Sequence, residues 1–141
     1  MTADDYERVY ELWISCTGMG LNNLDDSKEG IEKFLKRNPD TCFVAELNGI
    51  AIGTILAGND GRRGYIYHTA VSPDFRNKGI ASRLADRAVL ALADCGITKI
   101  ALAVFDKNED GNSFWENKGF AARNDIVFRI KNVCDTVDID T

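Results

Sequence analysis

The most informative stretch of the sequence is Val71-Ser72-Pro73-Asp74-Phe75-Arg76-Asn77-Lys78-Gly79-Ile80-Ala81. The residues just before it, Tyr65 to Val71, are rich in β-branched and aromatic side chains and predict a strand that ends at Ser72-Pro73. The residues after it predict the longest helix of the chain, which Gly96 stops. The apolar face of that helix consists of Ile80, Leu84, Ala88, Ala91 and Cys95. The stretch is therefore predicted to be a turn from a strand into a helix.

This turn has the composition of an anion-binding site. Gly79 and Ala81 carry little or no side chain, so successive backbone N–H groups at the helix start can face a ligand, and the helix dipole reinforces them. Arg76 and Lys78 add positive charge that suits a pyrophosphate. The segment matches neither a nucleotide P-loop nor the dinucleotide pattern Gly-x-Gly-x-x-Gly. Taken alone, these residues fit equally well an ordinary turn with one glycine and two solvated cations.

Two amphipathic helices are predicted near the start of the chain. The first begins behind Asp4 and Asp5. The second has Asp26 and Ser27 as candidate caps and is stopped by Asn38-Pro39. Their apolar positions are Tyr6, Val9, Tyr10, Trp13 and Ile14 in the first helix, and Ile31, Phe34 and Leu35 in the second.

Strand patterns account for much of the remaining chain. Cys42 to Leu47 and Ile50 to Ala57 predict an antiparallel hairpin around Asn48-Gly49. The apolar run from Lys99 to Phe105 predicts a strand in a sheet interior. The remaining predictions are a helix from Asp110 to Lys118, a hairpin of Phe120 to Arg123 with Ile126 to Lys131 around Asn124-Asp125, and a loose polar tail from Asn132 to Thr141. This order of elements predicts an α/β (α+β) sandwich with one central sheet.

Composition indicates one globular domain, which we place at residues 1–131, followed by the polar tail at 132–141. The chain has 141 residues, of which 45% are hydrophobic and 28% charged. Four scattered cysteines indicate reduced, buried thiols, and no apolar stretch approaches the roughly 20 residues of a membrane span. We therefore expect a cytoplasmic protein without a membrane partner. The net charge of −5 argues against nucleic acid as a partner.

The turn and one later block resemble the GNAT superfamily of acetyl-CoA-dependent N-acetyltransferases, and the run from Gly64 to His68 into Ala70-Val71 resembles its small bacterial members. Arg76-x-x-Gly79-x-Ala81 is similar to the family's pyrophosphate loop, and Ala70-Val71-x-Pro73 to the strand before it. The later block, Asn108-x-x-Gly111-x-x-Phe114-Trp115-Glu116-x-x-Gly119-Phe120, resembles the family's Asn-x-x-Ala-x-x-Phe-Tyr-Glu-x-x-Gly-Phe. The resemblance extends from Thr41 to Lys131.

The resemblance implies a three-layer sandwich whose mixed, mostly antiparallel sheet is flanked by helices and has a splayed strand pair that forms the acyl-CoA cleft. It implies that acetyl-CoA is the cosubstrate and that the acetyl group moves to a primary amine by direct attack in a ternary complex. Val71 and its neighbours would hold the pantetheine arm. The cofactor-binding residues that it implies are Ala70, Val71, Arg76, Asn77, Lys78, Gly79, Ile80, Ala81, Asn108, Gly111 and Trp115.

The sequence departs from the family's pattern at three places. Trp115 stands where the family often has a tyrosine that protonates the departing thiolate, and an indole N–H is a hydrogen-bond donor but no useful acid. Ala103 stands, by register, where relatives that modify protein N-termini carry a glutamate base. The family's first strand has no evident counterpart before Tyr6. The first two departures favour a small-molecule amine over a protein N-terminus as the acceptor.

A base must deprotonate the ammonium group, since only the free amine attacks. His68, the only histidine, lies on the strand that feeds the cleft, and an imidazole exchanges protons near neutral pH. A buried structural histidine is the alternative. Tyr65 and Tyr67 share the opposite face of that strand by alternation, where one could replace the missing acid, with packing as the favoured alternative. Glu46 is a weaker candidate base. The candidate catalytic residues are His68, Tyr67 and Trp115.

Two carboxylates on the acceptor side have alternative interpretations. Asp25 and Asp26 follow the loop from Gly18 to Asn23, which borders the acceptor in this fold. They could receive a cationic amine, but for Asp26 we favour a helix cap. One histidine and scattered cysteines argue against a zinc site, so no metal is expected. No Gly-x-Ser-x-Gly elbow exists, which argues against a serine hydrolase.

Two further functions stay open on sequence grounds. Trp115 and Ala103 would suit a catalytically weak acyl-CoA-binding sensor module. An acetyltransferase that acts on a protein or on an aminoacyl-tRNA amine is the other, although the negative net charge opposes the tRNA version. Terminal strands that leave a sheet edge open would be compatible with a homodimer.

Overall fold

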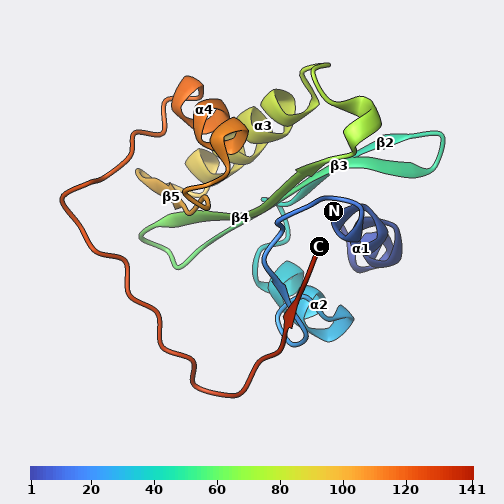
Figure 1. The fold of residues 1–141 in the computed structure, drawn as a ribbon, viewed down its shortest axis with the longest axis horizontal. Helices are drawn as coiled ribbons and strands as arrows, with labels where there is room; N and C mark the ends of the chain where they lie inside the picture. The colour runs from blue at the N-terminus through green and yellow to red at the C-terminus, as the bar shows by residue number, and fades with distance from the viewer.

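A computed structural model describes residues 1–141 and shows three layers, in which the main sheet lies between two layers of helices (Figure 1). The helices are α1 (Tyr6–Ile14), α2 (Lys28–Arg37), α3 (Ile80–Asp94) and α4 (Glu109–Asn117). The main sheet has the strand order β2 (Phe43–Leu47), β3 (Ile50–Asn59), β4 (Gly64–Val71) and β5 (Ile100–Leu102). Its first three strands are antiparallel and β5 lies parallel to β4. The predicted mixed sheet is confirmed.

Helices cover both faces of the sheet and form two separate cores. On one face, α1 and α2 bury Trp13, Val9 and Ile31 against Ala51, Leu56 and other strand residues. On the other face, α3 and α4 bury a second cluster that includes Leu92, Ala85 and Trp115. Figure 1 shows α1 and α2 on one side of the sheet and α3 and α4 on the other. The helical periodicities in the sequence therefore identified most of both packing faces, but Ile14 and Cys95 at the helix ends are exposed.

Local chemistry fixes the ends of these elements. The hairpin between β2 and β3 turns at Asn48 and Gly49, which both have positive φ, as a type I′ turn requires. The Ser27 side chain accepts a hydrogen bond from the Gly30 N–H at 3.1 Å and is the N-cap of α2. The expectation that Asp26 caps this helix is therefore wrong, because the next residue performs that task.

Replacing Ser27 with alanine is expected to lower the free energy of unfolding by about 1 kcal/mol. The substitution removes the acceptor of the Gly30 N–H and the hydroxyl that donates to the Leu24 carbonyl at 2.7 Å, but no apolar packing. Urea unfolding followed by circular dichroism measures it. An unchanged unfolding midpoint would show that solvent replaces the hydroxyl at this helix end.

A β-bulge in β4 changes which side chains face α1 and α2. Thr69 lies opposite Ile55, whereas Ile66 lies opposite Ala57, so one more residue stands on β4 than on β3 between these pairs. Ile66 accordingly packs in the α3 core, while Ala70, four residues later, packs in the α1 core. In a regular strand these two side chains would share one face. The bulge therefore breaks the alternation at Tyr67 and His68.

β4 and β5 separate after a short contact. Only the residues 64–66 of β4 pair with β5, opposite Ile100 to Leu102, whereas β4 continues to Val71. The strand expected from Lys99 to Phe105 is thus shorter than predicted and lies at the sheet edge rather than in its interior. The edge of β4 from residue 67 to 71 faces no neighbouring strand on that side. This separation is the splayed strand pair that the sequence resemblance implied.

The C-terminal part differs from expectation. The predicted hairpin of Phe120 to Arg123 with Ile126 to Lys131 is not formed, and the chain runs outside the sandwich here (Figure 1). Asn124-Asp125 lacks the glycine that a tight hairpin turn favours, and an isolated two-stranded hairpin has little stability without a face to pack on. The end of the expected loose tail pairs instead, as β6 (Asp138–Ile139) lies antiparallel to β1 (Leu21–Asn22).

The four cysteines are free, and only two of them are buried as expected. Cys16 and Cys42 lie in the α1 core, where burial raises the pKa of the Cys42 thiol. Cys95 and Cys134 are exposed, which corrects the prediction for them. Cys95 belongs to the last turn of the apolar pattern of α3, but it follows the end of the helix and points away from the core.

Candidate active site

The turn from β4 into α3 presents a row of backbone donors to solvent. Residues 76–79 are exposed, and Gly79, with φ of 75°, is the residue that precedes α3. The first helical bond runs from the Arg83 N–H to the Gly79 carbonyl, so the N–H groups before Arg83 have no helix partner. Asn77 also has a positive φ of 59°. Successive N–H groups around left-handed residues form a concave anion site, which fits a diphosphate.

The two cations of this turn are held differently. The Arg76 Nε donates to the Val71 carbonyl at 3.3 Å, which leaves its terminal nitrogens free to contact phosphate. The Lys78 Nζ lies 5.1 Å from the centre of the Phe75 ring, in a cation–π contact. Both side chains therefore stay beside the free donors of α3. Ala81 and Ile80 lie in the first turn of the helix, as the sequence predicted.

The second motif builds the start of α4 beyond the open end of β5. Asn108 is the N-cap, and its Oδ1 accepts a hydrogen bond from the Gly111 N–H at 2.9 Å. A Cβ at Gly111 would lie 2.6 Å from the Asn108 Nδ2, so only glycine admits this side-chain position. The amide Nδ2 of Asn108 remains a donor on an exposed residue. Gly111 thus holds the side chain of Asn108 in place, and its own contact with the cofactor stays a prediction.

Trp115 lies in a core rather than at the surface. Its ring is 7% exposed and packs edge-on against Phe114 and Phe120, with centroids 4.9 and 5.1 Å away. These contacts belong to the α3 side of the sheet. Packing is therefore the role that the surroundings of Trp115 explain, and Ala103, the other departure from the family's pattern, is exposed just after β5.

His68 forms a polar pair with a buried carboxylate. Its Nε2 lies 2.6 Å from the Asp26 Oδ1, and Asp26 is only 4% exposed. The Trp13 ring meets the imidazole edge-on at 5.1 Å. Asp26 comes from the loop before α2, and Trp13 comes from α1. The imidazole is therefore held by contacts with the layer that α1 and α2 form. The His68 side chain is still 15% exposed.

Two tyrosines occupy the same face of β4 as His68. Tyr67 packs edge-on against Phe34 of α2 at 5.4 Å, and the Tyr65 ring lies 4.7 Å from that of Tyr67. The expectation that the tyrosines face away from His68 is wrong, because the bulge at residues 67 and 68 brings both to the α1 and α2 side. Burial raises the pKa of both phenols, and the charge of Asp25 adds to it for Tyr67, so both keep their protons.

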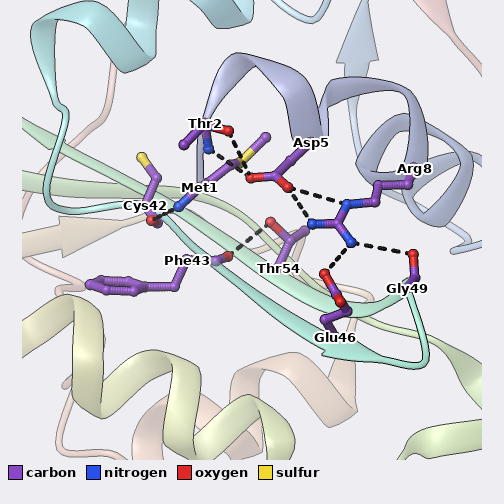
Figure 2. Close-up of polar contacts among 9 residues, drawn as sticks. All are labelled: Met1, Thr2, Asp5, Arg8, Cys42, Phe43, Glu46, Gly49 and Thr54. Carbon is purple, nitrogen blue, oxygen red and sulfur yellow. Dashed lines mark hydrogen bonds and ion pairs between the residues drawn. The ribbon is translucent and has the colours of Figure 1, made fainter.

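Glu46 lies away from these residues, on the β2–β3 hairpin. Figure 2 shows its carboxylate against the guanidinium of Arg8, which also binds Asp5 and donates to the Gly49 carbonyl at 3.2 Å. This network joins α1 to the hairpin, so a structural role accounts for Glu46. It does not join His68 at the separation of β4 and β5.

The loop after α1 lies near the chain that leaves β5. A Cβ at Gly20 would lie 3.3 Å from the Phe105 ring, so this loop reaches the chain that leaves β5. The Gly18 N–H donates to the Thr141 carbonyl, and the Met19 N–H to the Thr141 Oγ1 at 3.0 Å. Sequence patterns gave no signal for this bridge or for the contact between Asp26 and His68, whose partners lie 42 positions apart.

Comparison with known proteins assigns the fold and motifs to one family. The profile described as "Acetyltransferase (GNAT) family" matches residues 6–120. A curated acetyltransferase of Sodalis glossinidius is 34% identical over 132 residues, which cover 94% of this chain and 92% of the relative. The chain belongs to the GNAT acetyltransferase family. It is therefore classed as an N-acetyltransferase that uses acetyl-CoA.

Two further relatives extend this comparison. An acetyltransferase of Pectobacterium atrosepticum is 41% identical to this acetyltransferase over 106 residues, 75% of this chain and 74% of the relative. The PaiA N-acetyltransferase of Thermoplasma acidophilum, solved in complex with coenzyme A, has the same fold. It superposes with a TM-score of 0.75 at 19% identity and covers 98% of this chain and 93% of that one. No helix of the acetyltransferase is long and apolar enough to cross a bilayer.

Proposed function

We propose that this acetyltransferase transfers an acetyl group from acetyl-CoA to a primary amine of a small molecule, and that His68 is its general base. The observation that favours a small molecule as the acceptor is the proximity of the α1–α2 loop to Phe105. In this proposal the loop lies across one end of the separated strands, where a protein substrate would need an open groove. We place the enzyme in the cytoplasm, since its four cysteines are free.

The side chains on the acceptor side suit an amine with an apolar body. Tyr67 and Phe105 are each 54% exposed, so aromatic surface is available there. Asp25 is close enough to raise the pKa of Tyr67, and its charge attracts an ammonium group. Aromatic faces also stabilise cations directly. An ammonium group attached to a ring or an alkyl chain therefore matches both features.

The protons balance in this proposal. His68 takes one proton from the substrate ammonium, which frees the lone pair of the amine. The C–N bond forms at the acetyl carbonyl and the C–S bond breaks. Tyr67 donates its phenol proton to the departing thiolate, and the nitrogen gives its second proton to Tyr67 in return. His68 finally releases its proton to solvent, so the products are the amide, the CoA thiol and one proton.

Backbone groups supply orientation rather than chemistry. The unpaired edge of β4 from residue 67 to 71 can pair with the pantetheine amides, while the start of α3 holds the phosphates. Asn108 offers its amide Nδ2 from the opposite side of the opening. Fixing the thioester beside the amine lowers the activation free energy of such reactions, by about 7 to 11 kcal/mol when the two groups are ideally oriented.

A panel of acceptors tests the proposal. Calorimetry should first detect acetyl-CoA binding, which also raises the melting temperature by mass action. Release of the CoA thiol is then followed with small aromatic, aliphatic and amino-acid-like amines, with peptides that have a free N-terminus, and with aminoacyl-tRNA. Turnover with a small amine is the expected result. Binding of acetyl-CoA with turnover only on peptides or tRNA, or with none, would overturn the small-molecule assignment.

A further inference from the structure

We infer that Asp26 is a positioning residue that fixes the tautomer of His68, so that Nδ1 is the nitrogen that accepts the substrate's proton. This inference rests on the proposed function of His68 as the base. It assigns a role to the most buried carboxylate of the acceptor side, which the helix cap of Ser27 leaves without a capping function.

Asp26 is held by two contacts to its carboxylate and one to its main-chain carbonyl. Its Oδ2 accepts the Asn22 N–H at 2.7 Å, and its main-chain carbonyl accepts the Tyr6 hydroxyl at 2.9 Å. The remaining oxygen, Oδ1, lies 2.6 Å from the His68 Nε2. Because loop and helix fix Asp26, the acceptor position that it offers to the imidazole is also fixed. A surface carboxylate with free rotation could not select one ring nitrogen in this way.

The chemistry of the pair decides the tautomer. An ionised carboxylate only accepts hydrogen bonds, so the Nε2 of a neutral His68 must carry the proton in this contact. The lone pair then lies on Nδ1, which makes Nδ1 the basic atom. The Trp13 ring, 5.1 Å away, restricts rotation of the imidazole.

Other ionisable groups reach the pair from each neighbouring element. Tyr6 of α1 contacts the Asp26 carbonyl, Asp25 lies next to Asp26 in the loop, and Tyr67 is adjacent to His68 on β4. Burial keeps both phenols neutral by raising the pKa of Tyr6 and of Tyr67. Asp26 is therefore the one carboxylate in direct contact with the ring, whereas Tyr6, Asp25 and Tyr67 do not contact the imidazole through a hydrogen bond.

The tautomer can be observed without any acceptor. His68 is the only histidine, so ¹⁵N-labelled protein without a polyhistidine tag gives one pair of imidazole nitrogen resonances. Two-bond ¹H–¹⁵N correlation at a pH where the ring is neutral should show the proton on Nε2 in the wild-type protein. A proton on Nδ1 would overturn the inference outright. This measurement does not depend on the folding of any variant.

Kinetics of Asp26→Asn supply the second test. An amide can donate as well as accept, so it no longer selects one tautomer. We expect kcat to fall about 10- to 100-fold, part of the about 10²- to 10⁴-fold that acid–base catalysis contributes, with the acetyl-CoA Kd within about threefold. Ser27→Ala is the matched control, because it weakens the same loop without touching the carboxylate. It should keep its kcat.

The outcomes separate this inference from the proposed function. A wild-type protein that acetylates no amine would contradict the proposed function, while the NMR spectrum would still decide the tautomer. A folded Asp26→Asn variant with unchanged kcat, or one that loses kcat only as much as Ser27→Ala, would overturn the positioning role of Asp26. A loss of kcat in Asp26→Asn alone, together with a mixed tautomer in its spectrum, supports it.

Discussion

Replacement of His68 by alanine is expected to lower kcat about 10²- to 10⁴-fold at neutral pH, with little change in the affinity for acetyl-CoA. The reason is that a primary amine, with a pKa near 10.4 for a lysine-like group, is almost entirely protonated at neutral pH. Without an imidazole next to it, the amine must lose its proton to water. Steady-state rates with a small amine at saturating acetyl-CoA measure the effect.

The pH dependence distinguishes a base from a packing residue. Above the pKa of the substrate amine, the free form is plentiful, and the difference between wild type and His68→Ala should shrink. His68→Gln is the matched variant, because its amide can still bind the Asp26 carboxylate but cannot carry the proton. Both variants should be equally slow at neutral pH. A rate loss that persists at high pH would refute the general-base role.

Sequence periodicity was enough to predict the layers of the fold, since each amphipathic helix must bury its apolar face against the sheet. Asn48-Gly49 also fixed the first hairpin, because both residues adopt the positive φ that its turn requires. The turn from β4 into α3 was predictable for the same reason, because Gly79 adopts a positive φ just before the helix. Phosphate binding at this turn stays a prediction.

The acceptor side was harder to predict because its contacts join distant parts of the chain. Alternation along β4 placed Tyr67 and His68 on opposite faces, but the bulge opposite Leu56 brings both to one face. No glycine or proline marks this bulge in the sequence. The contact of Asp26 with His68 depends on that bulge and on the docking of α1. Local patterns contain neither piece of information.

The C-terminal strand prediction failed for a related reason. Ile126, Val127 and Phe128 have strong strand propensity but are each more than 60% exposed. Strand propensity reflects packing on a pleated surface, and here the chain meets no such surface. Ile139, in a tail that looked polar, packs against the α1 core instead. The strand therefore forms around a single apolar residue that has a surface to pack on, and not in the longer apolar run that has none.

Replacement of Gly79 by valine is expected to weaken acetyl-CoA binding by about 100-fold or more while the protein stays folded. A Cβ at this position would meet no atom of the protein within 4 Å, so the valine side chain displaces no protein atom and takes up open space at the proposed phosphate site. The positive φ of 75° costs a β-branched residue about 1 to 2 kcal/mol. That cost is small beside the stability of a domain of this size. Calorimetric titration with acetyl-CoA measures the change.

Gly96→Val separates backbone strain from ligand contact. Gly96 follows the other end of α3, has a φ of 79°, and likewise has no atom within 4 Å of the position of a Cβ. Both variants should therefore lose similar stability on thermal unfolding, but only Gly79→Val should lose acetyl-CoA binding. If Gly79→Val binds acetyl-CoA as tightly as Gly96→Val, the start of α3 does not hold the diphosphate. The difference between the two dissociation constants measures what the open backbone at Gly79 contributes, because strain is common to both.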